Sequence, residues 1–212
     1  MKIAILVFDG ITALDAIGPY EVLRSVPGWE VRFVGKQQGE VRTDSGALGL
    51  SADKALADVS EVDIVLVPGG QGNRALMEDD EVLGWLRKVD EGTKWTTSVC
   101  TGSLVLGAAG LLDGRRATCH WAFLEDLREH GAEPIQGRYI EDGKVLTAAG
   151  VSAGIDMALH LVGQEAGPEV AQAVQLGIEY DPQPPFDAGS PEKAPAPIVE
   201  IVTAVARDPA SA

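Results

Sequence analysis

Apolar runs of strand length alternate along the chain with longer segments in which apolar residues recur at helical spacing. The strand-length runs are Lys2–Phe8, Trp29–Val34, Asp63–Val67 and the residues from Trp95 up to Cys100. Continuous apolar runs of this length are typical of strands buried on both faces of a parallel sheet. Helical spacing is found in Thr12–Val26 from Pro19 onward, Trp121–His130, Val151–Val162 and Pro168–Tyr180. The alternation predicts one α/β domain with a mainly parallel sheet flanked by helices.

Three further segments carry weaker signals. Val41–Leu50 predicts short β-structure around a Ser-Gly turn, and Arg138–Ile140 with Lys144–Thr147 predicts a hairpin. Arg115–His120 predicts a short strand that ends in Cys119 and His120. None of these segments changes the predicted fold class.

The C-terminal part of the chain has a different composition. Asp181–Pro197 holds six of the twelve prolines, too many for a helix or a central strand, and predicts an extended arm. Pro197–Arg207 then predicts a closing helix, and Asp208–Ala212 is expected to fray. Because no linker or internal repeat divides the sequence, we expect residues 1–212 to form a single domain with this arm at about 181–197.

Charge and cysteine content narrow the function classes. The net charge of -15 disfavours nucleic acid, whose phosphates would be repelled. The 212 residues include only two cysteines, and no secretory signal is evident, so we expect free thiols in a reducing compartment. No stretch is apolar over the length needed to cross a bilayer. We therefore expect a cytoplasmic protein that binds neither membrane nor nucleic acid.

Cys100 marks the corner where an apolar, β-prone run turns into a Gly- and Ala-rich helical pattern. Such a corner holds a side chain over the carboxyl edge of a sheet, at a helix N-terminus that favours an anion. We expect this thiol to ionise easily and to act as a nucleophile. The alternative is that Cys100 is a small, buried apolar side chain at a strand end, as many free cysteines are.

Three other segments are expected at the same edge of the sheet. Asp15 lies between the first strand and the helix expected from Pro19, where it is a site residue, a solvated loop acid or a helix cap. The glycine-rich loop after Pro68 allows close approach of backbone N–H groups to a ligand, but it matches no nucleotide-binding motif. The small residues before Val151 form a second strand-to-helix corner whose N–H groups face the same cleft.

His120 and Cys119 are adjacent and should face opposite ways along a strand. His120 is a candidate for orienting or protonating a group near Cys100, although a histidine at a helix start is commonly a cap or a packed side chain. Cys119 is expected to be a structural thiol.

These residues together resemble the ThiJ/PfpI superfamily, which has the class I glutamine amidotransferase-like, flavodoxin-like fold with a nucleophile elbow. The matching motifs are Asp15-Ala16-Ile17-Gly18-Pro19, Pro68-Gly69-Gly70, Ser98-Val99-Cys100-Thr101-Gly102-Ser103, Ala117-Thr118-Cys119-His120-Trp121 and Thr147-Ala148-Ala149-Gly150. Within the superfamily the chain resembles the isonitrile hydratases, through Cys100-Thr101, Asp15 and the arm from Ile178 to Phe186.

The resemblance implies that Cys100 is the nucleophile, that Asp15 is the acid beside it, and that the Gly70 and Thr101 N–H groups face the reacting atom. Relatives of the peptidase type carry His directly after the nucleophile, whereas this chain has Thr101, so their base is missing. The resemblance also implies a homodimer and no metal or organic cofactor.

Three functions follow as hypotheses. The first is hydration of an organic isocyanide to an N-substituted formamide, through a thioimidate on Cys100 protonated by Asp15. The second is glyoxalase-like action on a 2-oxoaldehyde, in which His120 would serve as a base near neutral pH. The third is a redox or ligand sensor in which Cys100 is oxidised without turnover.

Overall fold

The computed structural model of the chain describes residues 1–208. The chain divides into two compact units, Met1–Ile178 and Glu179–Ala212, and each is described by itself. The first unit holds the predicted α/β fold and every candidate site residue. The second unit holds the proline-rich arm, so the prediction of one domain over residues 1–212 stays a prediction.

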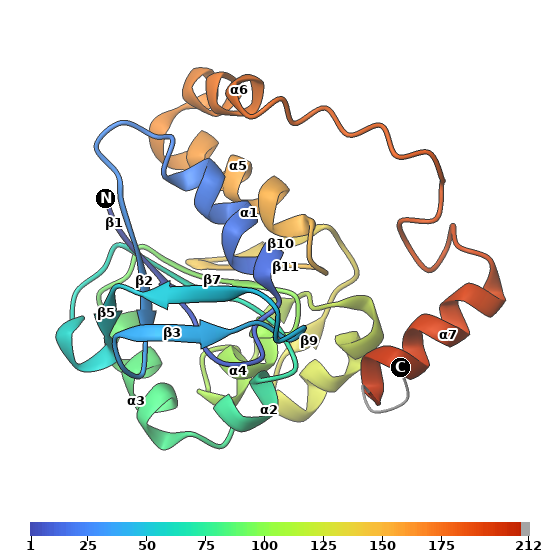
Figure 1. Cartoon of the computed structure of the whole chain (residues 1–212), viewed down its shortest axis with the longest axis horizontal. Helices are drawn as coiled ribbons and strands as arrows, with labels where there is room; N and C mark the ends of the chain where they lie inside the picture. The colour runs from blue at the N-terminus through green and yellow to red at the C-terminus, as the bar shows by residue number, and fades with distance from the viewer. Residues whose placement is uncertain (209–212) are drawn as a thin grey trace. The chain divides into compact units, whose positions relative to one another are not determined.

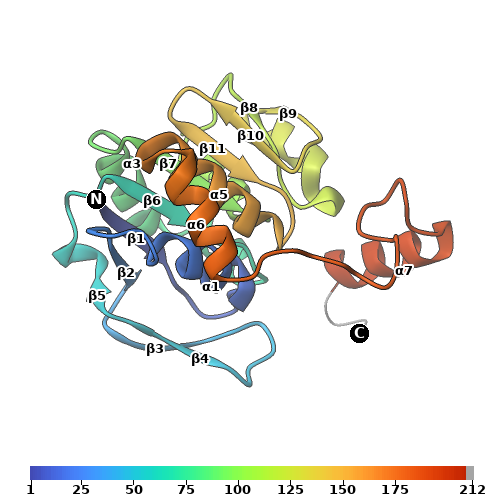
Figure 2. The ribbon, with the colours of Figure 1, turned by 90° about the horizontal axis from the view of Figure 1, so that it is seen from above.

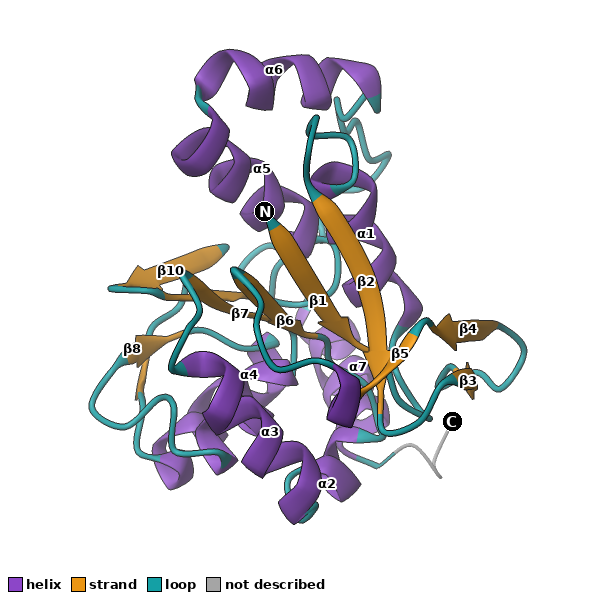
Figure 3. Ribbon diagram, turned by 90° about the vertical axis from the view of Figure 1, so that its left-hand side faces the viewer, coloured by secondary structure: helices purple, strands orange, loops and turns teal. Residues whose placement is uncertain are grey.

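A seven-stranded sheet in the order β10-β11-β7-β6-β1-β2-β5 forms the centre of the first unit (Figure 3). Its strands are β1 (Lys2–Leu6), β2 (Glu30–Gly35), β5 (Lys54–Ala55), β6 (Ile64–Val67), β7 (Trp95–Val99), β10 (Tyr139–Asp142) and β11 (Val145–Ala148). All neighbouring pairs are parallel except β10 and β11. Every residue of β6 is buried, as the continuous apolar run Asp63–Val67 predicts, and every residue of β11 is buried as well.

Helices cover both faces of this sheet (Figure 1). One face carries α1 (Ala13–Leu23), α5 (Ala153–Ala166) and α6 (Pro168–Gly177), and the other carries α2 (Asn73–Leu76), α3 (Asp80–Asp90) and α4 (Gly102–Ala108). Two 3₁₀ segments, η1 (Leu56–Asp58) and η2 (Trp121–His130), complete the helical part. The mainly parallel sheet flanked by helices confirms the predicted fold class.

Two small sheets lie at opposite sides of the first unit (Figure 2). They pair β3 (Gly39–Arg42) with β4 (Gly49–Ala52), and β8 (Arg116–Ala117) with β9 (Glu133–Pro134). The predicted strand Arg115–His120 is therefore too long. It ends early because the Thr118 N–H donates to the Thr147 side chain at 2.8 Å instead of continuing a ladder. Cys119 and His120 consequently follow the strand.

The first helix begins earlier than predicted. It starts at Ala13, so Asp15 lies in its first turn, and Pro19 lies inside it. Proline lacks an N–H and is usually unfavourable there. Here Pro19 packs against α5, where a Cβ on Gly154 would come within 3.0 Å of the proline ring. Pro19 therefore lies at the contact between α1 and α5, and this packing fixes Asp15 on a rigid element.

In the second unit, residues 179–195 form neither helix nor strand, and α7 (Ala196–Arg207) follows them. The predicted arm over Asp181–Pro197 and its closing helix stay a prediction, although the helix α7 begins at Ala196, one residue earlier than predicted. No residue of α7 is buried. Fraying was expected for Asp208–Ala212, but residues 209–212 lie outside the described part of the chain, so it stays a prediction.

Candidate active site

Cys100 occupies a strained elbow between β7 and α4. Its φ of 59° lies in the left-handed region, which costs a non-glycine residue roughly 1–2 kcal/mol. The Cys100 N–H donates to the carbonyl oxygens of Ala148 and Ala149, both at 3.1 Å, and these bonds hold the conformation. A Cβ at the next glycine, Gly102, would lie 2.0 Å from the Val67 oxygen, so only glycine fits there. The predicted corner is thus present, and it fixes the position of the thiol.

Asp15 is fully buried beside this elbow, with 0% of its surface exposed. Its Oδ2 accepts a hydrogen bond from the Gly69 N–H at 2.8 Å, whereas its Oδ1 has no partner within residues 1–208. Burial raises the pKa of Asp15 to about 7, although the bonds with Gly69 and the Cys100 thiol oppose the rise. Near neutral pH the carboxyl group can therefore both accept and donate a proton.

The environment of Cys100 keeps its thiol protonated. Burial, followed by the charges of Asp15 and Cys119, raises the pKa of Cys100 well above its usual range. Hydrogen bonds from the N–H groups of Thr101 and Val151 to the sulfur act in the opposite direction but are smaller effects. The expectation of an easily ionised thiol is therefore wrong, because removal from water outweighs the start of the seven-residue helix α4.

The loop after β6 connects the two candidate catalytic residues. Gly69 binds Asp15, while the Gly70 N–H donates to Thr101 Oγ1 at 3.2 Å and Asn73 Nδ2 donates to the same oxygen at 3.0 Å. Gly70 has φ 138°, and a Cβ there would lie 2.3 Å from the Gly10 oxygen. The Gly70 N–H was expected to face the reacting atom. In the structure it donates to the Thr101 hydroxyl oxygen instead, so this expectation is corrected. The N–H groups at the sulfur are those of Thr101 and Val151.

Gly69 and Asn73 are the site residues that sequence reasoning missed. Gly69 lies in the glycine-rich loop after Pro68, which the sequence places near the site, but the sequence does not reveal which glycine contacts Asp15. Asn73 begins the four-residue helix α2, and nothing in its sequence context distinguishes it from a solvated loop residue. Only folding brings Gly69 to Asp15 and Asn73 to Thr101.

His120 caps the 3₁₀ segment η2 and packs against Gly150. Its Nδ1 accepts a hydrogen bond from the Ala122 N–H at 3.2 Å. A Cβ on Gly150 would lie 2.5 Å from His120 Cδ2, and Gly150 directly precedes Val151. Burial lowers the pKa of His120, so the ring is neutral at pH 7 with its proton on Nε2. With Nδ1 used in the cap, the ring is a hydrogen-bond donor rather than a base.

Cys119 is a buried thiol behind the elbow. Burial raises the pKa of Cys119 to about 12, although hydrogen bonds with Ser103 and with the His120 backbone oppose the rise. Ser103 Oγ in turn donates to the Cys100 carbonyl oxygen at 3.1 Å. Both cysteines are free. This packing is consistent with the structural role predicted for Cys119.

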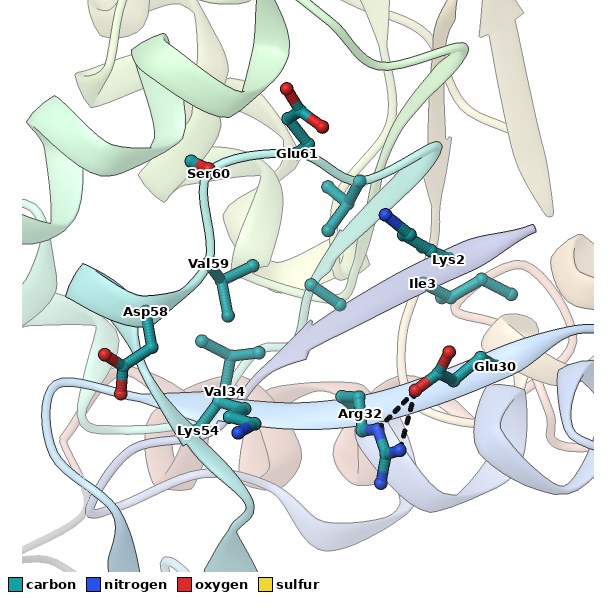
Figure 4. A pocket seen from close by; sticks show the side chains of 12 residues that line it. Lys2, Ile3, Glu30, Arg32, Val34, Lys54, Asp58, Val59, Ser60 and Glu61 are labelled. Atoms are coloured by element: carbon teal, nitrogen blue, oxygen red, sulfur yellow. Dashed lines mark hydrogen bonds and ion pairs between the residues drawn. The ribbon is translucent and has the colours of Figure 1, made fainter.

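The structure also has a cavity of about 490 Å³ at the other end of the sheet (Figure 4). It lies over the first residues of β1 and β2, whereas Cys100 follows the last residue of β7. Its charged lining residues are three cations and three anions: Lys2, Arg32, Lys54, Glu30, Asp58 and Glu61. Arg32 is paired with Glu30 at 2.6 Å. The cavity is therefore separate from the candidate site and favours neither sign of charge.

Neither a metal site nor a membrane-spanning helix is found among residues 1–208. No group of three or more His, Cys, Asp or Glu side chains is arranged to hold a metal ion. Within the same residues, no helix combines the length and apolar character that crossing a membrane would demand.

Comparison with known proteins places this site in a family. A model of the DJ-1/PfpI family matches residues 1–164. An isonitrile hydratase of Pseudomonas putida is 45% identical over 200 residues, which cover 94% of this chain and 87% of that protein. A deglycase of Thermococcus kodakarensis is 30% identical over 147 residues, covering 68% of this chain and 86% of that protein.

A solved structure agrees over nearly the whole length. The crystal structure of a ThiJ/PfpI family protein from Pseudomonas syringae has a TM-score of 0.94 and 37% identity, covering 97% of this chain and 86% of that one. The resemblance predicted from the sequence motifs is thus confirmed. The chain belongs to the DJ-1/PfpI family.

Proposed function

We propose that the protein is an isonitrile hydratase that converts an organic isocyanide and water into an N-substituted formamide. The observation that carries this proposal is the buried pair of Cys100 and Asp15, whose carboxyl group has a pKa of about 7. An isocyanide carbon must receive both a nucleophile and a proton, and this pair supplies both. The 45% identity to the Pseudomonas putida isonitrile hydratase supports the same assignment.

In the first step the sulfur and the proton of the thiol add to one carbon atom. Asp15 in its carboxylate form accepts the Cys100 proton, the sulfur bonds to the isocyanide carbon, and Asp15 returns the proton to that carbon. The product is a thioimidate, Cys100–S–CH=N–R, and Asp15 regains its initial charge. A proton carrier with a pKa near the working pH suits both transfers.

In the second step water adds to the carbon of the C=N bond. The water proton passes through Asp15 to the nitrogen, which gives a tetrahedral intermediate bearing OH, NH–R and the sulfur. The C–S bond then breaks, the formamide leaves, and the hydroxyl proton returns to the sulfur. The Thr101 and Val151 N–H groups, which lie at the sulfur, stabilise the negative charge that develops as it leaves.

The glyoxalase-like alternative is less well supported. It needs a base near neutral pH beside Cys100, and His120 uses Nδ1 to cap η2 while burial lowers its pKa. A redox sensor needs a thiolate that is present at rest, and burial raises the pKa of Cys100 instead, whereas the hydratase needs the thiolate only while Asp15 holds its proton. Both observations favour the hydratase.

The proposal is tested by incubating the folded protein with a simple alkyl or aryl isocyanide and quantifying the formamide by chromatography. We expect turnover by the wild type and none by Cys100→Ser, because the hydroxyl is a far weaker nucleophile than the thiol and no strong base lies beside it. Consumption of methylglyoxal without any formamide from isocyanides would instead favour the glyoxalase-like function.

A further inference from the structure

The side chain of Asn73 is buried and is hydrogen-bonded on only one side. Its Nδ2 donates to Thr101 Oγ1 at 3.0 Å, and its Oδ1 is buried without a partner in the part of the chain that the structure describes. Buried amide oxygens in folded proteins are normally paired with protein groups or with ordered water. Asn73 Oδ1 is therefore an unpaired acceptor on a side chain that contacts Thr101, the residue directly after Cys100.

Thr101 presents an open donor beside this acceptor. Its Oγ1 accepts hydrogen bonds from the Gly70 N–H at 3.2 Å and from Asn73 Nδ2 at 3.0 Å. A hydroxyl group has two acceptor positions and one proton, so these two bonds direct its proton away from both donors. Within residues 1–208 no acceptor for this proton is found. The open donor thus lies on the residue directly after Cys100, and the open acceptor lies on the side chain that is hydrogen-bonded to it.

A water molecule would pair both groups, because it can accept the Thr101 proton in one hydrogen bond and donate another to Asn73 Oδ1. Ordered buried waters typically make two to four bonds to polar groups that would otherwise be unpaired. We propose that a water held between Asn73 Oδ1 and the Thr101 hydroxyl is the water that hydrolyses the thioimidate on Cys100. This inference rests on the proposed function, and it makes Asn73 a positioning residue for the second step alone.

The chemical step leaves Asn73 unchanged. The water donates one proton to Asn73 Oδ1 and accepts the Thr101 proton in hydrogen bonds, which orients its remaining lone pair. Its oxygen bonds to the thioimidate carbon, and the electron pair of the C=N bond moves to the nitrogen. The second water proton passes through Asp15 to that nitrogen. Loss of Asn73 should therefore slow hydrolysis and spare the formation of the S–C bond.

The two steps are separated by mixing the protein with an aryl isocyanide and following the mass of the chain together with the formamide. For Asn73→Ala we expect adduct formation close to the wild-type rate and hydrolysis slower by on the order of tenfold or more. The adduct then accumulates on Cys100. The matched control is Gln71→Ala, which removes an exposed side chain from the same loop and should behave as the wild type.

A conservative variant adds a signature that a merely structural role would not give. In Asn73→Asp, the new carboxyl group in its protonated form keeps an acceptor oxygen and a donor toward Thr101, whereas its ionised form loses the donor. The turnover of this variant relative to the wild type should therefore rise as the pH falls, and that of Asn73→Ala should not. Wild-type turnover by Asn73→Ala, or an equal loss of adduct formation and hydrolysis, would overturn the inference.

The water itself is tested without any assay of activity. A high-resolution crystal structure of the wild type should show a water within hydrogen-bond distance of Asn73 Oδ1 and Thr101 Oγ1, and Asn73→Ala should lack it. A wild-type structure without this water overturns the inference even if hydration occurs. If the water is present but the wild type makes no formamide, the proposed function fails, and the catalytic use of the water fails with it.

Discussion

Asp15 Oδ2 accepts a hydrogen bond of 2.8 Å from the Gly69 N–H, across 54 positions of the sequence. This bond joins the first turn of α1 to the loop after β6. A Cβ at position 69 would lie 2.7 Å from Asp15 Oδ2 and 2.8 Å from the Cys100 Cβ. The carboxyl group and the thiol therefore adjoin each other because the residue between them has no side chain.

Gly69→Ala should disrupt this arrangement. The added methyl group meets Asp15, Cys100 and the Thr101 nitrogen, so we expect a stability loss of about 1–3 kcal/mol and a larger loss of turnover. The matched control is Gly84→Ala, since a Cβ on Gly84 meets nothing within 4 Å and Gly84 lies inside α3. That variant should be more stable by roughly 0.5–1 kcal/mol with unchanged turnover. Urea denaturation and the formamide assay measure both. Equal stability and equal turnover of Gly69→Ala and Gly84→Ala would contradict the close contact of Gly69 with Asp15 and Cys100.

The raised pKa of Asp15 predicts how stability depends on pH. Folding raises this pKa from 3.8 to about 7, so the folded state binds the proton more tightly than the unfolded state. The proton-linked stability is complete below pH 3.8 and is lost as the pH rises towards 7. Asp15→Asn removes this titration, so its stability relative to the wild type should increase by on the order of a few kcal/mol between acidic and neutral pH.

Urea denaturation of both proteins at several pH values measures this difference. A difference between Asp15→Asn and wild type that stays constant from pH 4 to pH 8 would show that Asp15 has an ordinary pKa. Asp15 could then not serve as both proton donor and proton acceptor near neutral pH.

His120 is expected to contribute to stability but not to the pH dependence of the rate. His120→Ala removes the cap of η2 and should cost about 0.5–2 kcal/mol, whereas His120→Asn keeps a capping acceptor and should cost less. Both variants should retain the wild-type shape of kcat/KM against pH. If either variant loses a limb of that profile, His120 is a proton carrier and the glyoxalase-like function becomes the better explanation.

The homodimer implied by the family resemblance stays a prediction. Sedimentation at micromolar concentration should give twice the 22.3 kDa of one chain. A mass of 22.3 kDa under these conditions would contradict it.

The sequence predicted the features that depend on local pattern and strand order. The continuous apolar runs located the buried strands, and their parallel pairing brings Cys100, Asp15 and the loop after Pro68 to one edge of the sheet. The small residues after Cys100 indicated the elbow, where Gly102 leaves no room for a side chain.

The remaining features depend on packing between distant segments. The packing of Pro19 against Gly154 and the contact of Gly69 with Asp15 both join segments that are far apart in the sequence. The raised pKa of Cys100 follows from burial by the whole fold, which no local motif encodes. A sequence motif could therefore indicate the candidate reactive residues but could not give the direction in which burial shifts their pKa values.

The central claim is that Asp15 carries the proton that Cys100 and the isocyanide exchange. The direct test is the rate of formamide formation by Asp15→Asn, measured beside the rate at which iodoacetamide alkylates Cys100. Asparagine can still accept the Gly69 hydrogen bond but cannot take the proton that the Cys100 thiol loses, so alkylation should also be slower than in the wild type. It cannot carry the proton, so hydration should fall by on the order of a hundredfold or more. Turnover near the wild-type rate by Asp15→Asn would contradict the claim.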